Sequence, residues 1–115
     1  MRTLNDIMFP GHFSAIQTAG NAINPIVLPD DCKLQEIILN PHTVIDAETT
    51  FDLLKNGTDT TIDATLASAS ADEVGVSLDL GTSAIHFKKG DAFGMQSNGE
   101  QVAATLADVC VIFRR

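Results

Sequence analysis

The segment around Asn56-Gly57 constrains the fold more than any other part of this sequence. Residues 49–55 alternate in polarity and are rich in Thr, Leu and Phe, and residues 58–62 are rich in Thr and end in Ile. Such residues suit the pleated, half-buried surface of a β-strand. An Asn-Gly pair between two strands readily adopts the left-handed conformations of a tight turn. The segment therefore predicts a β-hairpin with Asn56 and Gly57 as its turn.

Further short strands are predicted along the rest of the chain. Residues 33–40, 74–80 and 101–113 carry apolar side chains that alternate or fill both faces, as in half-buried or central strands. Shorter candidates are residues 12–19, 26–28, 43–47, 85–88 and 92–96. Gly90 and Asp91 predict a turn, because glycine tolerates positive φ and aspartate bonds nearby backbone amides. About eight strands without a long amphipathic helix predict an all-β fold, an antiparallel β-sandwich.

The 115 residues fit one domain. Residues 1–11 show no sustained alternation and close with a Pro-Gly turn signal, so they predict an N-terminal arm, and residues 12–115 predict the sandwich domain. The arm carries four large apolar side chains, Leu4, Ile7, Met8 and Phe9. Each would gain about 1.5–3 kcal/mol if fully buried on a partner. Folding back onto the chain's own sandwich is the alternative.

The charge balance excludes several partners. Fifteen acidic and seven basic residues give a net charge of -8, which repels nucleic-acid phosphates and anionic membrane surfaces. The first residues lack the apolar run of a secretory signal, and no later segment reaches the roughly 18 apolar residues of a membrane span. The sequence therefore predicts a chain made in the cytoplasm that binds neither nucleic acid nor membrane.

Motifs of enzyme chemistry are missing from the sequence. It has no Gly-x-Ser-x-Gly elbow, no phosphate-binding glycine loop and no His-Glu-x-x-His pair. His12, His42 and His86 stand singly, without the paired spacing of a cupin metal site, and are interpreted as solvated or hydrogen-bonded side chains. We therefore expect no catalytic residue, no metal and no cofactor.

Other polar groups receive structural interpretations. The acidic pairs Asp30-Asp31, Asp59 with Asp63, and Asp72-Glu73 lack the spacing of a calcium loop and are interpreted as solvated turn carboxylates. Cys32 and Cys110 are expected to be buried thiols. Two basic pairs, Lys88-Lys89 and Arg114-Arg115, are interpreted as keeping strand ends solvated, with a basic patch for an acidic partner as the alternative.

Residues 50–58 read Thr-Phe-Asp-Leu-Leu-Lys-Asn-Gly-Thr, residues 85–91 read Ile-His-Phe-Lys-Lys-Gly-Asp, and an apolar strand follows. Across residues 25–113 this resembles the jelly-roll domains of tailed-phage virion proteins, in which a Thr-Phe-x-Val-x-x-Asn-Gly-Thr hairpin precedes a Phe-x-x-Gly-Asp corner and an alternating last strand. The hairpin and corner also recur in tumour-necrosis-factor-like and collagen-tip trimers, whose aromatic-rich inner strands this sequence lacks.

The resemblance implies a capsid cement or decoration protein of the small trimeric jelly-roll type. Such a protein is a homotrimer that binds the major capsid protein on the outside of the assembled head, stabilises it and remains on the virion surface. Its arm, here with Leu4, Ile7, Met8 and Phe9, would reach across neighbouring capsid subunits. The alternative is a receptor- or carbohydrate-binding tip of a tail fibre or spike, although the chain has neither Trp nor Tyr to stack on a sugar. A small cupin-type enzyme is the third alternative.

Overall fold

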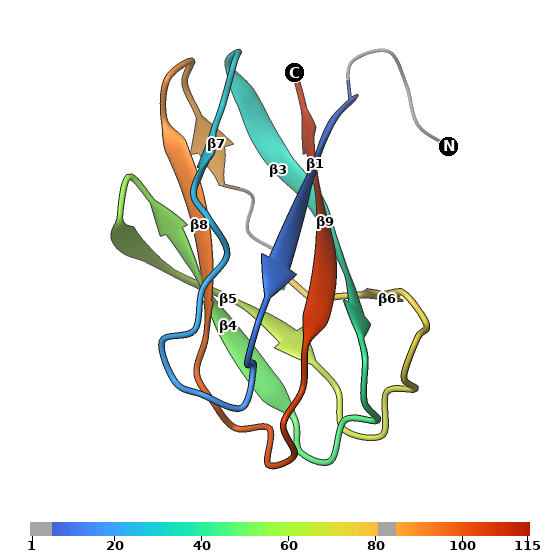
Figure 1. The fold of residues 1–115 in the computed structure, drawn as a ribbon. Helices are drawn as coiled ribbons and strands as arrows, with labels where there is room; N and C mark the ends of the chain where they lie inside the picture. Colours follow the sequence, from blue (N-terminus) through green and yellow to red (C-terminus); the bar gives the residue numbers. More distant parts are fainter. Residues whose placement is uncertain (1–5, 81–84) are drawn as a thin grey trace.

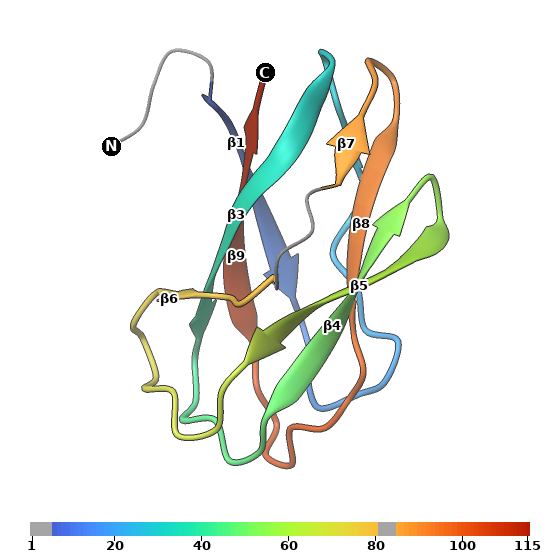
Figure 2. The same ribbon diagram turned by 180° about the vertical axis from the view of Figure 1, so that it is seen from behind.

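Two antiparallel β-sheets pack face to face in the computed structural model, which describes residues 6–80 and 85–115 (Figures 1 and 2). The described strands are β1 (Asp6–Phe13), β2 (Ile26–Val27), β3 (Cys32–Pro41), β4 (Thr49–Lys55), β5 (Thr58–Leu66), β6 (Val76–Ser77), β7 (His86–Phe87), β8 (Ala92–Ser97) and β9 (Ala107–Arg114). The predicted all-β antiparallel sandwich is confirmed. Within the same residues there is no helix with the length and apolar character that a membrane span requires.

The strand order places the two ends of the fold side by side. The first sheet has the order β1-β9-β3-β6, with β7 also paired to β3, and the second sheet has the order β2-β8-β4-β5. β1 pairs with β9 along its whole length, from Asp6 opposite Arg114 to Phe13 opposite Ala107. The chain passes from one sheet to the other between β1 and β2, β2 and β3, and β3 and β4. Among residues 6–80 and 85–115, the first sheet is therefore held together by pairing between strands that are distant in the sequence.

Five buried phenylalanines and the half-buried Phe9 fill the space between the sheets. Phe113 of β9 lies at the centre, with the ring centroids of Phe93, Phe87 and Phe9 at 5.4, 5.6 and 6.0 Å in edge-to-face arrangements. Phe13 and Phe51 form a second pair, with centroids 5.2 Å apart. Edge-to-face contacts add to the stabilisation that burial itself provides. These rings account for all six Phe residues of the chain.

The hairpin turn and the Gly-Asp corner contact each other. Asn56 and Gly57 have φ values of 53° and 80°, the left-handed conformations of a tight turn. The Asn56 side chain donates to Asp91 (3.1 Å) and accepts from the Ala92 amide (2.9 Å). Asp91 also accepts from the Lys88 amide at 2.9 Å, and this bond, followed by that from Asn56, lowers the pKa of Asp91. The two turns therefore brace the same corner of the sandwich.

The expected N-terminal arm is corrected from Asp6 onward. Residues 6–11 form most of β1, and the strand expected at residues 12–19 ends at Phe13. Pro10 does not end the strand because β1 is an edge strand, where one missing amide donor is tolerated. Beyond Phe13 the chain turns, held by bonds from the Ile16 amide to Thr105 and from the Ala15 amide to the Asn21 side chain. Leu4 lies outside the described residues.

One other expected strand, and the first part of the strand expected at residues 101–113, are loops. Residues 43–47 and 101–106 form no strand. Instead, the Asp46 carboxylate accepts hydrogen bonds from the amides of Val102 (2.9 Å) and Ala103 (3.0 Å). The buried Gln101 side chain donates to Thr105 at 3.1 Å. Side-chain capping therefore replaces strand pairing where the apolar pattern alone indicated a strand.

Candidate functional site

β1 presents an apolar surface at the edge of the first sheet. Within residues 6–80 and 85–115, no strand pairs with the edge of β1 that faces away from β9. Met8 is 55% exposed on the outer side, and Ile7 and Phe9 are half-buried against the core. Large side chains on an open edge strand are unusual unless another surface covers them. This edge is therefore the first candidate for a binding surface.

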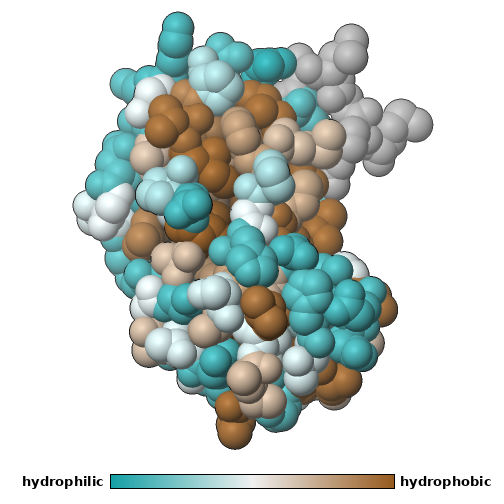
Figure 3. Space-filling view, viewed as in Figure 1, coloured by the Kyte–Doolittle hydropathy of each residue, from teal (hydrophilic) through white to brown (hydrophobic). Residues whose placement is uncertain are grey.

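Strand β2, at the edge of the second sheet, also carries apolar side chains. Ile26 of β2 is half-buried and Val27 is 64% exposed. Figure 3 shows apolar residues gathered on the upper half of the face that carries β1 in Figure 1. The term β1 surface is used below for Ile7, Met8 and Phe9.

The backbone of β1 limits how a partner can bind. Pro10 has no amide hydrogen, so a continuous ladder of hydrogen bonds along the free edge is interrupted at the middle of the strand. Gly11 allows close packing, since a Cβ there would lie 2.8 Å from Cγ1 of Val109. A partner is therefore expected to pack against side chains and not to add a strand.

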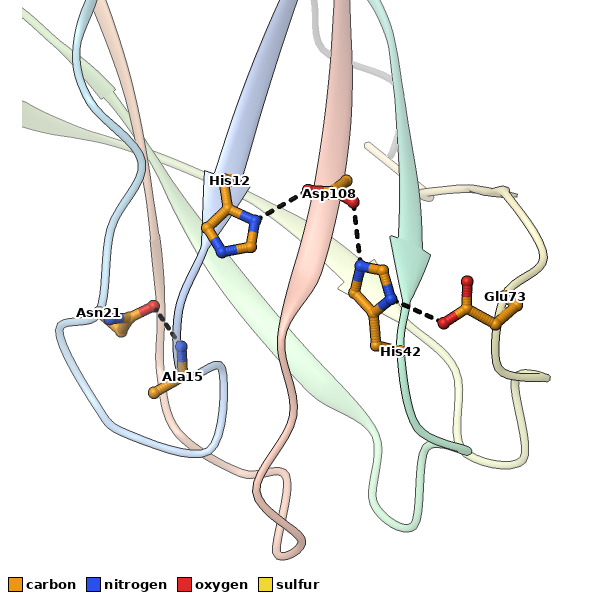
Figure 4. A network of polar contacts seen from close by, with 6 residues as sticks. All are labelled: His12, Ala15, Asn21, His42, Glu73 and Asp108. Atoms are coloured by element: carbon orange, nitrogen blue, oxygen red, sulfur yellow. Dashed lines mark hydrogen bonds and ion pairs between the residues drawn. The ribbon is translucent and has the colours of Figure 1, made fainter.

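A chain of hydrogen bonds crosses the lower end of the first sheet (Figure 4). His12 Nδ1 lies 2.8 Å from Asp108 Oδ1, and Asp108 Oδ2 lies 2.9 Å from His42 Nε2. His42 Nδ1 lies 2.6 Å from Glu73 Oε1. The bonds from Asp108 and then Glu73 raise the pKa of His42, and the bonds from His12 and His42 lower the pKa of Asp108. The network joins β1, β9 and two loops.

The stability conferred by this network depends on pH. The folded pKa of His42 lies above the ordinary value, so its contribution is complete below about pH 6.5 and is lost as pH rises through the raised pKa. We expect His42→Gln to reduce the free energy of unfolding more at about pH 5.5 than at about pH 9. Urea denaturation of both proteins at the two pH values measures this difference. An equal loss at both would contradict a protonated His42 in the network.

A shallow hollow of about 500 Å³ lies beside this network. Its lining residues are Pro10, Gly11, His12, Ala22, Asn24 and Asp108. It adjoins the β1 surface, because three of these residues belong to β1. The apolar part of β1 and this hollow are therefore adjacent and are considered together as the candidate interface.

An acidic patch occupies the outer side of the second sheet. Single carboxylate oxygens of Asp52, Asp59 and Asp63 lie within 4.8 Å of one another. Burial, followed by the neighbouring Asp52, raises the pKa of Asp63. Asp52 also accepts a hydrogen bond from Asn98 at 3.2 Å. The sequence pattern pairs Asp59 with Asp63 but does not include Asp52. Among the described residues, no further feature of this patch points to a bound cation.

Other predicted polar groups have specific partners. Asp30 pairs with Arg115 at 2.8 Å, and Asp31 accepts a hydrogen bond from the Lys89 amide at 2.9 Å. These carboxylates are therefore fixed and are not only solvated turn residues. Both cysteines are free, but only Cys32 is buried, whereas Cys110 is half-buried because it lies on the outer side of β9.

No protein-family model and no curated protein sequence matches the chain. A functional assignment therefore rests on the chain's own fold and surface, together with the resemblance in its turns.

Proposed function

We propose that the chain is a bacteriophage capsid cement, or decoration, protein. It is a structural protein of the virion, without enzymatic activity, and it binds the major capsid protein on the outside of the assembled head as a homotrimer. The observation that carries this proposal is the β1 surface, a set of large apolar side chains on a strand whose outer edge is unpaired among the described residues.

We further propose that the sandwich is a jelly roll. The strand orders β1-β9-β3-β6 and β2-β8-β4-β5 support this, because an eight-stranded jelly roll divides its strands between two sheets in the same way. β6 and β7 pair with opposite ends of β3, opposite Ile38-Leu39 and Cys32-Lys33. They act as two parts of one interrupted strand. Counted in this way, the nine short strands occupy the eight strand positions of a jelly roll.

In this proposal the capsid is bound through β1, in place of the free N-terminal arm that the sequence predicted. Ile7, Met8 and Phe9 are held on the sandwich by pairing with β9, so little conformational entropy is lost when a partner covers them. Full burial of an exposed large side chain contributes about 1.5–3 kcal/mol, so Met8 gains most of this range, and Ile7 and Phe9, already half-buried, gain less. A protein that binds only the assembled shell stabilises it relative to its dissociated subunits.

Met8→Asp tests this proposal. Met8 is 55% exposed, so the variant is expected to fold, whereas a buried carboxylate at the interface weakens capsid binding by roughly 10-fold to 100-fold. The measurement is co-sedimentation of the purified chain with heads from its source phage. Val102→Asp is the matched control, since Val102 is 79% exposed and lies in the loop that precedes β9, outside the β1 surface. Binding of Met8→Asp at wild-type affinity would reject the β1 surface as the docking site.

The copy number in purified virions separates the two virion functions. Quantitative mass spectrometry measures the molar ratio of the chain to the major capsid protein. A ratio near one supports a cement that covers the whole shell. A few copies per particle would favour the receptor- or carbohydrate-binding appendage tip, and absence from virions would reject both.

A further inference from the structure

His42 lies between two carboxylates that belong to different parts of the fold (Figure 4). Its Nε2 is 2.9 Å from Asp108 Oδ2, and its Nδ1 is 2.6 Å from Glu73 Oε1. Asp108 belongs to β9, whereas Glu73 belongs to the loop of residues 67–75 between β5 and β6. Among the described residues, the charged groups that act on His42 are these two carboxylates, and His12 of β1 reaches it only through Asp108.

Both contacts of His42 are hydrogen bonds only when the imidazole is protonated. An ionised carboxylate is solely an acceptor, and only the imidazolium carries a hydrogen on each ring nitrogen. A neutral imidazole has one N–H, so its other nitrogen presents a lone pair to a carboxylate oxygen. Loss of the His42 proton therefore converts one of the two attractions into a repulsion.

The surroundings of the two carboxylates indicate which contact is lost. Asp108 is fixed, because β9 pairs with β1 on one side and with β3 on the other. His12 Nδ1 also lies 2.8 Å from Asp108 Oδ1, and this single contact needs only one N–H, which a neutral His12 still has. The Glu73 side chain is 60% exposed on a loop and can turn into solvent. A neutral His42 therefore keeps its Nε2 hydrogen on Asp108 and releases Glu73.

The Glu73 contact is part of the attachment of the loop to residues 41–45. Backbone hydrogen bonds run from the Glu73 amide to Pro41 and from the Ala69 amide to Ile45, both at 2.7 Å. Ala69 and Glu73 have φ values of 66° and 57°, left-handed conformations that strain residues other than glycine. Strain of this kind persists only while the surrounding contacts maintain it. Release of the Glu73 side chain therefore weakens the attachment of the loop.

We propose that His42 is a pH-sensitive switch that fixes the loop of residues 67–75 against residues 41–45. The protonated imidazole bridges β9 and the loop and keeps the loop closed. The neutral imidazole releases Glu73, so the loop opens more often and exposes Ile45, which is buried in the closed form. The bond from Asp108, followed by that from Glu73, raises the pKa of His42, so the change occurs above about pH 6.5. The inference does not depend on capsid binding.

Amide hydrogen exchange of the full chain, followed by NMR and corrected for the intrinsic pH dependence of exchange, measures opening of the loop. Protection of the Ala69 and Glu73 amides is expected to fall about twofold to fivefold between about pH 5.5 and about pH 9, as for loss of an exposed ion pair. NMR of the His42 ring is expected to show hydrogens on both nitrogens at the lower pH and on Nε2 alone at the higher pH.

Glu73→Gln tests the role of the carboxylate. The Gln side chain can accept a hydrogen bond from a protonated Nδ1 and donate one to an unprotonated Nδ1, so the contact survives in both states of His42. The fall in protection is therefore expected to disappear in this variant. Asp72→Asn is the matched control, because it removes the same charge from the neighbouring exposed residue, which is not bonded to His42. It is expected to retain the fall.

Each of the following results would overturn the proposal. Protection that does not change with pH in the wild-type chain would show that the loop does not respond to His42. A fall that persists in Glu73→Gln would mean that another group causes it, and its loss in Asp72→Asn as well would indicate a general charge effect. A neutral His42 with its hydrogen on Nδ1 would show that the contact with Asp108, and not that with Glu73, is lost.

Discussion

Gly99→Ala is expected to destabilise the sandwich by about 3 kcal/mol or more. Gly99 has a φ of 80°, which an alanine adopts only with strain. A Cβ at this position would also lie 2.4 Å from the backbone nitrogen and 2.9 Å from the Cα of Ala19. Because these are backbone atoms of a turn, relief of the contact requires the loop that follows β1 to move. Urea denaturation monitored by circular dichroism measures the loss.

Gly57→Ala is the matched control for this variant. Gly57 has the same φ of 80°, but a Cβ there would meet no atom within 4 Å. Its free energy of unfolding is expected to fall only by the strain of the left-handed conformation, about 1–2 kcal/mol. The difference between the two variants therefore measures the contact with Ala19. Equal losses would show that this contact is not a barrier to a larger side chain.

Phe113→Ala is expected to cost about 3–5 kcal/mol in the free energy of unfolding. The Phe113 side chain is fully buried and touches three other rings, from β1, β7 and β8. Its removal leaves a cavity between the two sheets that the surrounding strands cannot close. The same denaturation experiment measures the loss.

Phe9→Ala provides the comparison for the core variant. Phe9 contacts the Phe113 ring but is half-buried at the sheet edge, so its truncation is expected to cost clearly less than that of Phe113. A loss as large as that of Phe113→Ala would mean that Phe9 belongs to the core. It would then be a poor candidate for the β1 surface.

Features set by neighbouring residues could be predicted from the sequence. The Asn56-Gly57 turn and the two strands beside it depend on local conformational preference, and Gly90-Asp91 depends on positive φ and a side-chain bond to a nearby amide. The apolar content of β3 and β9 indicates strands but not which side chains face inward, because both faces of each strand carry apolar residues. The sandwich follows from these elements because short strands must bury one face.

Features that depend on distant partners could not be predicted. A regular hairpin around Asn56-Gly57 would place Asp52 opposite Thr61, but the register shifts, and Asp52 lies opposite Asp63. Thr61 has a φ of 65° at this irregularity, and no sequence pattern predicts the register shift. The acidic patch is therefore a consequence of one bulge.

The first strand was missed for a similar reason. Pro10-Gly11 is a strong local turn signal, yet pairing with β9 at the other end of the chain keeps this segment extended. The hydrogen-bonded network likewise joins His12, His42, Glu73 and Asp108, which are far apart in the sequence. Neither the edge strand nor the network has a local pattern that distinguishes it from a turn or a solvated side chain.

The pairing of β1 with β9 also determines how the fold responds to mechanical force. Because Asp6 lies opposite Arg114, the start of the first strand and the end of the last strand meet at the same end of the sheet. Tension applied between these two points loads the paired residues one after another, so β1 separates from β9 progressively from that end. Tension that pulls the two strands along their length in opposite directions would load all eight pairs at once. If a partner holds the fold by β1, the pairing of β1 with β9 therefore resists a force directed along the strand much better than a force that lifts β1 at Asp6.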